Sequence, residues 1–406
     1  MSTVSTSSRP VRSVCDVIVV GGGVIGLTIA WRAAQSGRTA ILLDPSPASG
    51  ASRQAAGLLA PVTEVHYGED ALLQLNLASA RRYPAFAAEL EEASGTTIGY
   101  RQTGTLALAF DADDKAALDD LHTYQEALGL SSQPQSPREC RQLEPFLSPA
   151  VRGGLLVEGD HQVDSRRLID ALLVACTRAG VDIRHDAAGS VVVRDGVVVG
   201  IDTLGAESVI ADQTVLAAGC WSGQLKGLPP HVVPPVRPVK GQIVRLADDI
   251  DHPLLRHNVR ALVRGRPIYL VPRADGEIVV GATSEEKGFD TIVTVEGAGD
   301  LLADARELLP RVAEIALAEI SVGLRPGSPD NAPMIGASAL PGLSVATGHY
   351  RNGVLLAPIT ADLISELLNT GALPTGFDRF DPRRFDRSSN PGPSNPGPSN
   401  SDTVPA

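Results

Sequence analysis

Apolar residues near the start of the chain form two short unbroken runs with a helical pattern between them. The first strand candidate spans 16–20, is apolar after Asp16 and leads into a glycine-rich turn; the second spans 39–43, is apolar after Thr39 and is followed by Asp44. Residues 24–36 place apolar side chains at helical spacing, and Gly37 is suited to end that helix. Unbroken apolar strands are typical of a parallel sheet that is covered on both faces. We therefore predict a strand–helix–strand unit within a buried parallel sheet.

The turn after the first strand carries the spacing G-x-G-x-x-G at Gly21, Gly23 and Gly26. In this motif the first glycine permits a tight turn, the second lets the backbone approach a pyrophosphate, and the third lets the helix lie close to the sheet. The motif alone also fits any helix that begins after a turn. Here Asp44 follows Gly26 at close to the ~20 residues expected for an acid that binds a ribose hydroxyl. Strand, helix, second strand and acid together predict a dinucleotide-binding site.

The pattern further along the chain predicts two kinds of sheet. Residues 48–57 are mostly small, which suits the approach of a flat ligand and equally suits a plain surface loop. Helices are predicted at 71–90, 113–128, 165–179, 300–309, 312–320 and 354–369, and strands at 104–110, 190–193, 197–202, 213–218 and 343–347. Gly219 follows one of these strands, at the end where open α/β sheets bind ligands. From Pro229 onward, proline-rich alternating segments at 241–246, 267–271 and 277–281 indicate an antiparallel sheet.

This order of elements predicts an α/β fold, α+β overall, in which a Rossmann-like nucleotide-binding domain is interleaved with an antiparallel-sheet substrate domain. We assign 14–75, 145–228 and 323–387 to the nucleotide-binding domain and 76–144 and 229–322 to the substrate-binding domain. Residues 1–13 and the Pro/Gly/Ser/Asn-rich residues 388–406 are predicted to be disordered tails.

Charge and composition exclude several classes of protein. The formal net charge is -12, and the chain has no run of Lys or Arg, which argues against a nucleic acid or an anionic membrane as partner. The most apolar uncharged stretch, 17–31, is shorter than the ~18 residues that span a bilayer. A length of 406 residues with 43% hydrophobic residues is typical of a globular protein of about two domains.

Metal and nucleotide-hydrolysis motifs are missing from the sequence. The four cysteines are scattered without a C-x-x-C pair, which favours reduced thiols in a cytoplasm. The histidines form no H-E-x-x-H pair, so no metal site is expected, and there is no P-loop signature.

Several segments together resemble one family, the flavin-dependent amine and D-amino-acid oxidases, and within it most closely the glycine oxidases of bacterial thiamine biosynthesis. The resemblance rests on the 21–26 fingerprint, 55–58 (AAGL), 215–222 (VLAAGCWS), 238–242 (PVKGQ), 269–273 (YLVPR), 280–283 (VGAT), 323–327 (GLRPG) and 348–358 (GHYRNGVLLAP). These segments cover nearly the whole chain outside the tails. A D-amino-acid dehydrogenase or a sarcosine oxidase would share many of them.

The resemblance implies FAD as the cofactor. It places Val24, Ile25 and Asp44 at the adenosine and pyrophosphate, and Val191 or a neighbour at the adenine. The implied flavin-binding residues are Pro45, Ala51, Ser52, Ala56, Gly57 and Leu58, together with the C-terminal loop His349, Tyr350, Arg351, Asn352, Gly353, Val354 and Leu355. Covalent relatives attach the flavin through a cysteine near the position of Arg325, and none of the four cysteines lies beyond Cys220. The FAD is therefore expected to be non-covalent.

The resemblance also implies the substrate-binding residues. Glycine oxidases bind the substrate carboxylate with an arginine and a tyrosine that correspond to Arg325 and Tyr269, and Arg351, placed near the flavin, is expected to assist as a third catalytic residue. A guanidinium binds a carboxylate through two parallel hydrogen bonds, and a phenol adds one directional bond. Without the resemblance, a packed surface tyrosine and a solvated arginine would explain the same residues.

The implied reaction is oxidative deamination of glycine, with other small amines or D-amino acids tolerated. Its products are an imine or glyoxylate, ammonia and, with O2 as oxidant, hydrogen peroxide, and the imine is expected to pass to thiazole synthesis. The alternatives are a D-amino-acid dehydrogenase, a sarcosine oxidase-like enzyme and a flavin-binding protein without turnover. The expected partners are the amino acid, O2 and a thiazole synthase; a homo-oligomer is compatible with the sequence, which leaves the oligomeric state open.

Overall fold

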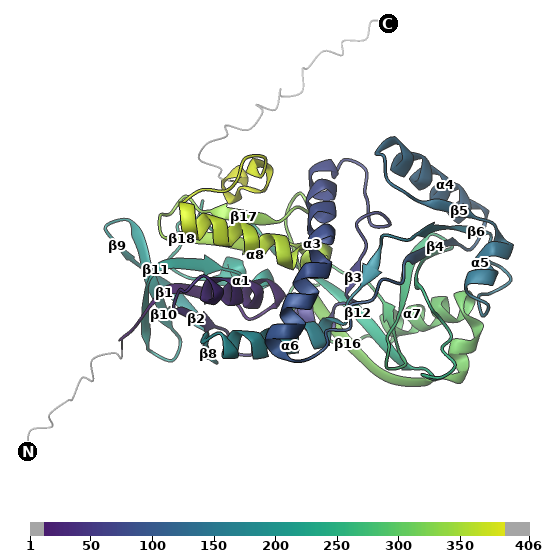
Figure 1. Cartoon of the computed structure of the whole chain (residues 1–406), viewed down its shortest axis with the longest axis horizontal. Helices are drawn as coiled ribbons and strands as arrows, with labels where there is room; N and C mark the ends of the chain where they lie inside the picture. The colour runs from purple at the N-terminus through teal and green to yellow at the C-terminus, as the bar shows by residue number, and fades with distance from the viewer. Residues whose placement is uncertain (1–11, 386–406) are drawn as a thin grey trace, which may run out of the picture.

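The computed structural model describes residues 12–385, which include two large sheets side by side along the long axis of the molecule (Figure 1). The predicted tails lie outside the described residues, with one correction. Arg12 and Ser13 belong to the first strand, because Arg12 pairs with Ser208 and Ser13 with Val209.

The first sheet has the strand order β17-β18-β11-β1-β2-β8, with β10 and β9 added beside β11. Its strands are β1 (Arg12–Val20), β2 (Ala40–Leu43), β8 (Asp182–Arg184), β9 (Ala188–Arg194), β10 (Val197–Thr203), β11 (Ser208–Leu216), β17 (Met334–Ala337) and β18 (Leu343–Thr347). The pairs β1–β2, β1–β11, β2–β8 and β11–β18 are parallel. This is the parallel sheet that the apolar runs predict.

Helices cover one face of this sheet. They are α1 (Val24–Gln35), α3 (Asp70–Ser94), α6 (Ser165–Arg178) and α8 (Gly353–Thr370), and their buried side chains form one core with Val17, Val19 and Leu42 (Figure 1). The alternate residues Ile18, Val20 and Leu43 are buried on the other face with the β9–β10 hairpin. Burial on both faces explains why these strands are apolar throughout.

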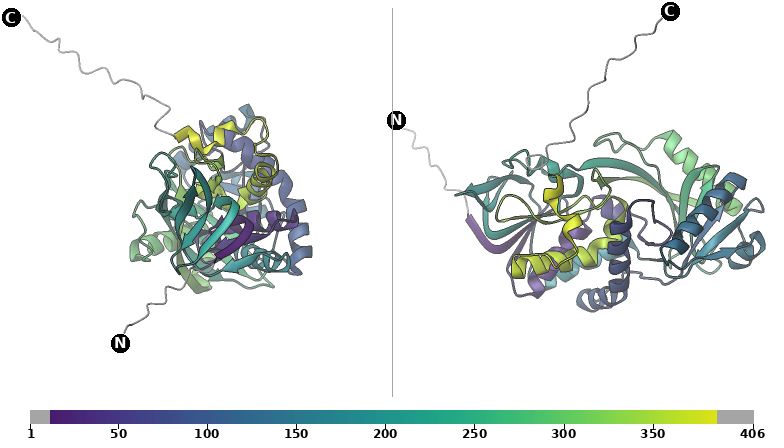
Figure 2. Two further views of the ribbon diagram at one scale, coloured as in Figure 1. Left: turned by 90° about the vertical axis from the view of Figure 1, so that its left-hand side faces the viewer. Right: turned by 90° about the horizontal axis from the view of Figure 1, so that it is seen from above.

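The second sheet has the order β16-β12-β15-β14-β13-β4-β6-β5. Its strands are β4 (Thr105–Ala109), β5 (Gln133–Gln135), β6 (Gly153–Val157), β12 (Arg237–Ala247), β13 (Asn258–Val263), β14 (Arg266–Pro272), β15 (Glu277–Gly281) and β16 (Ala316–Gly327). It is antiparallel as predicted except for the parallel pair β13–β4. The helices α5 (Pro137–Leu143) and α7 (Val295–Leu308) cover one face of this sheet, and α4 (Ala112–Ala127) packs against β4 and β6. The other face of the strands β12, β15 and β14 is turned toward the first sheet (Figure 2).

One predicted helix, 312–320, is wrong. Residues 310–314 form a 3-10 turn, and β16 begins at Ala316 and pairs with β12 along its whole length. The Ala- and Leu-rich local sequence favours a helix, but the pairing with a strand far away in the sequence overrides that weak local preference.

Three segments join a different sheet or layer from the one expected. Helix α3 packs against α6 and α8, whereas most of it was assigned to the substrate domain. Strand β6 and the end of β16, assigned to the nucleotide domain, pair within the second sheet. In each case the segment's place in the fold depends on pairing or packing with residues distant in the sequence. Local sequence patterns do not encode such contacts. The division into two domains itself stays a prediction.

Within 12–385, no helix is both long and apolar enough to cross a membrane. Two small elements lie between the large sheets, next to the site described below. They are a two-stranded sheet of β3 (Leu58–Leu59) and β7 (His161–Gln162) and the short helix α2 (Ala51–Gln54).

Candidate active site

A cavity of about 970 Å³ runs between the two large sheets, from the carboxyl ends of β1, β2 and β11 to the face of β12, β15 and β14 that α5 and α7 do not cover. Its walls include most of the residues predicted as cofactor contacts: Gly21, Gly23, Val24, Ile25, Asp44, Pro45, Ala51, Ser52, Ala56, Gly57, Leu58, Gly219, His349, Tyr350, Arg351, Gly353 and Val354. The volume is at the upper end of what small-molecule sites occupy, which suits a large cofactor with a small substrate.

The glycine turn and Asp44 form the end of the cavity at the N-terminus of α1. Gly22 donates its N–H to Asp44 Oδ2 at 2.6 Å, and Val24 donates its N–H to Ser52 Oγ at 3.0 Å. A Cβ atom on Gly23 would meet only Ser52 Oγ, at 3.3 Å, so the protein's own packing leaves this position open. Gly23, the N-cap of α1, has no side chain to cap the helix, so beyond the Val24 N–H the positive end of α1 is open to an anion, as a pyrophosphate requires.

The C-terminal loop forms the opposite wall. After β18, residues 349–352 turn sharply, with Tyr350 at φ 48°, and α8 begins at Gly353 without a side-chain cap. Tyr83 and Ser79 of α3 donate hydroxyl hydrogen bonds to the carbonyls of Val354 and Leu355, at 3.1 and 2.6 Å, and so fix the start of α8. A second uncapped helix N-terminus therefore faces the cavity, where it would stabilise negative charge on a reduced flavin.

His349 is buried in this loop, and its Nε2 lies 3.0 Å from the hydroxyl oxygen of Thr360. Burial lowers the pKa of His349 to about 3, so the imidazole is neutral at physiological pH. Two further features of the wall fit FAD. The buried Oε1 of Gln54 has no hydrogen-bond partner among the described residues, so it can accept one from a bound ligand, and the short loop after β11 brings Gly219 to the cavity.

Four residues predicted as cofactor contacts do not line the cavity. A Cβ on Gly26 would lie 1.9 Å from the carbonyl oxygen of Gly21, so Gly26 has the helix–strand packing role expected of the third glycine and is not itself a cofactor contact. Val191 is buried in the core behind β9, while its neighbours 187–189 border the cavity. Asn352 and Leu355 are buried behind the cavity wall, because the backbone turn and the first turn of α8 point them inward.

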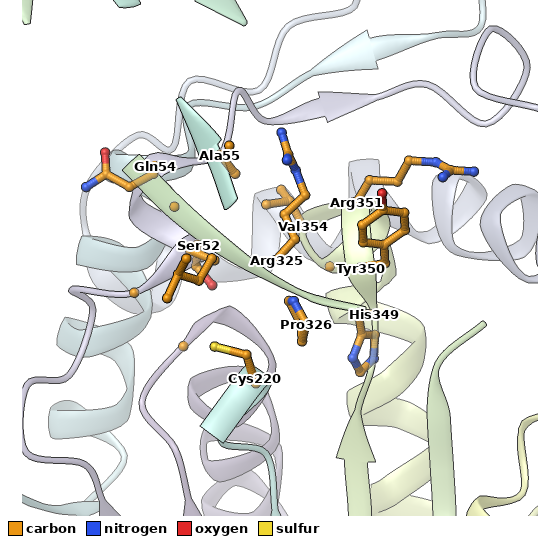
Figure 3. A pocket seen from close by; sticks show the side chains of 18 of the residues that line it. Ser52, Gln54, Ala55, Cys220, Arg325, Pro326, His349, Tyr350, Arg351 and Val354 are labelled. Atoms are coloured by element: carbon orange, nitrogen blue, oxygen red, sulfur yellow. The ribbon is translucent and has the colours of Figure 1, made fainter. Parts of the chain in front are cut away.

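Arg325 and Tyr269, predicted as substrate-binding residues, both line the part of the cavity that lies over the second sheet, which we call the substrate chamber. They approach it from opposite edges of a segment of four strands. Arg325 lies on β16 and Tyr269 on β14, with β12 and β15 between them. The intervening strands provide room through two glycines: a Cβ on Gly241 would lie 2.4 Å from Arg325 Nη1, and a Cβ on Gly281 would lie 2.3 Å from the Tyr269 hydroxyl oxygen. Figure 3 shows the Arg325 side chain beside Val354, with its guanidinium pointing away from Pro326.

The charge environment distinguishes the three arginines that line the cavity. Arg260 pairs with Glu64, and Arg351 donates to Glu69 at 2.9 Å, with its guanidinium pointing away from Arg325 (Figure 3). Arg325 has no carboxylate partner among the described residues and donates only to the carbonyl of Thr283, at 3.1 Å. Burial raises the pKa of the Tyr269 phenol, and the nearby positive charge of Arg325 opposes that shift.

Sequence reasoning missed several residues of this chamber. Arg260, a charged residue in the buried strand β13, was a usable signal, whereas Glu64 lies in an irregular segment without one. Gly241 and Gly281 lie in predicted strands, where a glycine marks a close approach. No group of three or more His, Cys, Asp or Glu side chains within 12–385 is placed to hold a metal ion. The absence of a metal stays a prediction.

Known proteins match nearly all of the chain. The family model described as FAD dependent oxidoreductase matches residues 16–367. The bifunctional protein ThiO/ThiG of Synechocystis sp. is 36% identical over 94% of this chain and 55% of its own length, and the glycine oxidase of Geobacillus kaustophilus is 34% identical over 87% and 92%. The chain thus spans about half the length of the bifunctional relatives it matches.

A crystal structure supports the same relationship. The glycine oxidase from Geobacillus kaustophilus superposes with a TM-score of 0.84 at 31% identity, over 91% of this chain and 98% of that one. The sequence resemblance, the predicted fold class and the predicted FAD cofactor are confirmed. The chain belongs to the FAD dependent oxidoreductase family.

Proposed function

We propose that this protein catalyses the FAD-dependent oxidative deamination of glycine and related small amino acids. The observation that carries the proposal is the arrangement of Arg325, which lines the cavity without a carboxylate partner among the described residues and faces the same chamber as Tyr269. An uncompensated guanidinium in a partly buried chamber is stabilised by an anionic ligand. The substrate carboxylate is such a ligand.

The cavity residues would hold FAD in this order: the N-terminus of α1 would bind the pyrophosphate, Asp44 the ribose, residues 187–189 the adenine, and residues 51–58 with 349–354 the flavin. When bound, FAD accepts a hydride from the substrate Cα. The other contacts expected from the sequence are retained as part of this proposal, with residues 187–189 in place of Val191 and without Gly26, Asn352 and Leu355.

The chain's own residues contribute mainly orientation. A carboxylate held by the guanidinium fork of Arg325 and the Tyr269 hydroxyl is fixed at two points, which also fixes the direction of the adjacent Cα–H bond. Arg351 was predicted as a third catalytic residue. Its ion pair with Glu69 favours a different role, in which it holds the C-terminal loop to the segment before α3.

The product imine hydrolyses to glyoxylate and ammonia, and O2 is reduced to hydrogen peroxide. A hand-off to a thiazole synthase is supported by the names of the bifunctional ThiO/ThiG relatives. The four cysteines are free and buried, which supports a cytoplasmic location.

Mixing the FAD-loaded protein with glycine, sarcosine or D-alanine and measuring both flavin bleaching without O2 and peroxide release with O2 tests the proposal. Glycine should bleach the flavin and release peroxide. Bleaching without peroxide would favour a dehydrogenase with another electron acceptor, preference for sarcosine would favour a sarcosine oxidase-like enzyme, and no bleaching with any amine would favour a flavin-binding protein without turnover.

A further inference from the structure

A second arginine lies beside Tyr269 in the substrate chamber. Ala107, Arg260, Tyr269 and Gly281 occupy one row across β4, β13, β14 and β15. Side chains of directly paired residues lie on the same face of a sheet, ~5 Å apart at Cβ. Arg260 therefore stands next to Tyr269 on the face that carries the chamber, and both residues line the cavity.

Glu64 neutralises this arginine. It comes from the segment between β3 and α3, and its carboxylate forms an ion pair with Arg260 Nη1. The two side chains are 15% and 25% exposed, respectively. In such a partly buried place, an ion pair is screened less than on the surface.

The segment that carries Glu64 is held rigidly. The buried carboxylate of Asp160 accepts hydrogen bonds from the N–H groups of Val62 and Thr63, at 3.1 and 2.7 Å, and from the Thr63 hydroxyl at 2.7 Å. Glu64 itself donates its N–H to the carbonyl of Ala60 at 3.1 Å. These bonds fix the backbone of the segment, and the ion pair with Arg260 places the Glu64 carboxylate.

The chamber therefore presents one guanidinium that is available to a ligand, Arg325, and one that is occupied, Arg260. A ligand with one carboxylate satisfies Arg325 and leaves the Arg260–Glu64 pair intact. A ligand with a second carboxylate on the far side of its amine would bring that group toward Arg260, where it meets the negative charge of Glu64. Like charges at short range in a partly desolvated site are strongly unfavourable.

We propose that Glu64, by occupying Arg260, makes the site selective for amino acids with a single carboxylate. Removing the charge of Glu64 frees Arg260 to bind a second carboxylate, and the site then accepts N-carboxymethyl amino acids such as iminodiacetate. Glu64 is in this respect a residue that determines specificity. This inference rests on the proposed function for its substrate class.

Binding of inert ligands tests the inference without turnover. Methoxyacetate and diglycolate differ by one carboxylate and lack an oxidisable amine, and their Kd values are read from the perturbation of the flavin absorption spectrum. We expect the wild type to prefer methoxyacetate and Glu64→Gln to shift the ratio of the two Kd values toward diglycolate by about tenfold. The double variant Glu64→Gln/Arg260→Met should lose that shift.

Turnover supplies the second readout. The ratio of kcat/KM for iminodiacetate to that for glycine should rise about tenfold in Glu64→Gln through a lower KM, and fall back in the double variant. The matched control is Glu89→Gln. It removes the carboxylate of a partly exposed ion pair between Glu89 on α3 and Arg32 on α1, and it should change neither ratio.

An unchanged Kd ratio in Glu64→Gln, or an equal gain in the double variant, would overturn the inference, because either result would mean that Arg260 does not capture the second carboxylate. Failure of the proposed function has a different signature. In that case the wild type does not bleach with glycine or any other small amino acid, while the Kd ratios still decide the role of Glu64.

Discussion

Gly281 lies opposite Tyr269 in the β14–β15 ladder, and a Cβ atom on Gly281 would come within 2.3 Å of the Tyr269 hydroxyl oxygen. A Cβ atom on Gly241, in the neighbouring strand β12, would likewise lie 2.4 Å from Arg325 Nη1. Neither glycine has a positive φ, so backbone conformation does not require them. They are explained by the space that the two polar side chains occupy above the sheet.

Gly281→Ala should displace the Tyr269 hydroxyl and raise the KM for glycine, lowering kcat/KM about tenfold, because one directional hydrogen bond to the carboxylate is lost. Oxidation of an amine without a carboxylate should change much less. Steady-state kinetics with glycine and ethylamine measure both. Gly299→Ala on the exposed side of α7, where a Cβ meets nothing within 4 Å, is the control and should leave kinetics unchanged. Normal glycine kinetics in Gly281→Ala would contradict the role of Tyr269.

Arg325→Ala should leave the flavin spectrum intact and nearly abolish flavin reduction by glycine. The substrate would lose a charge-assisted pair in a desolvated site, at a cost on the order of 2–5 kcal/mol. Arg325→Lys retains the charge but loses the two-pronged geometry, so it should recover only part of the activity. Anaerobic stopped-flow reduction of the flavin measures the loss. Near wild-type reduction rate and affinity in the alanine variant would show that the substrate carboxylate binds elsewhere.

FAD should be bound without a covalent link. Cys220 is the cysteine that lines the cavity, and burial raises the pKa of its thiol to about 12, so the reactive thiolate is not formed at neutral pH. After acid precipitation the yellow colour should remain in the supernatant, and Cys220→Ala should retain its flavin. Colour that stays with the protein pellet in the wild type but not in Cys220→Ala would contradict this expectation.

The protein should lose stability in mild acid because of His349. Its pKa lies at about 3 in the folded state against 6.5 in an unfolded chain, so between these values the unfolded state binds the additional proton. The free energy of unfolding should therefore fall by up to about 1.4 kcal/mol per pH unit as the pH drops below 6.5. Urea unfolding at pH 7.5 and 5.5, at fixed FAD concentration, measures the decrease.

His349→Gln removes the titrating group and can still bond to Thr360, so its decrease between pH 7.5 and 5.5 should be smaller than that of the wild type by about 1 kcal/mol. The exposed His231→Gln serves as the control. An identical pH dependence in the wild type and His349→Gln would show that the imidazole is protonated in the folded protein.

The sequence alone determined the nucleotide-binding unit, because its signals are local. The glycine spacing, the apolar runs 16–20 and 39–43 and the acid at Asp44 all act within about thirty residues, where backbone geometry and burial leave few alternatives. The local structure at Gly26 follows the expected packing role directly, since the helix passes within contact distance of the preceding strand.

Only the tertiary structure decided how the substrate chamber is built. The local sequence of the first part of β16 favours a helix, and only its pairing with β12 makes the segment a strand. This pairing also brings the Arg325 side chain over Gly241. The Arg260–Glu64 pair joins residues 196 positions apart, and a charged residue in a strand does not reveal its partner. Charge compensation between distant segments depends on which side chains share a partly desolvated space, and that is settled only when the two sheets come together.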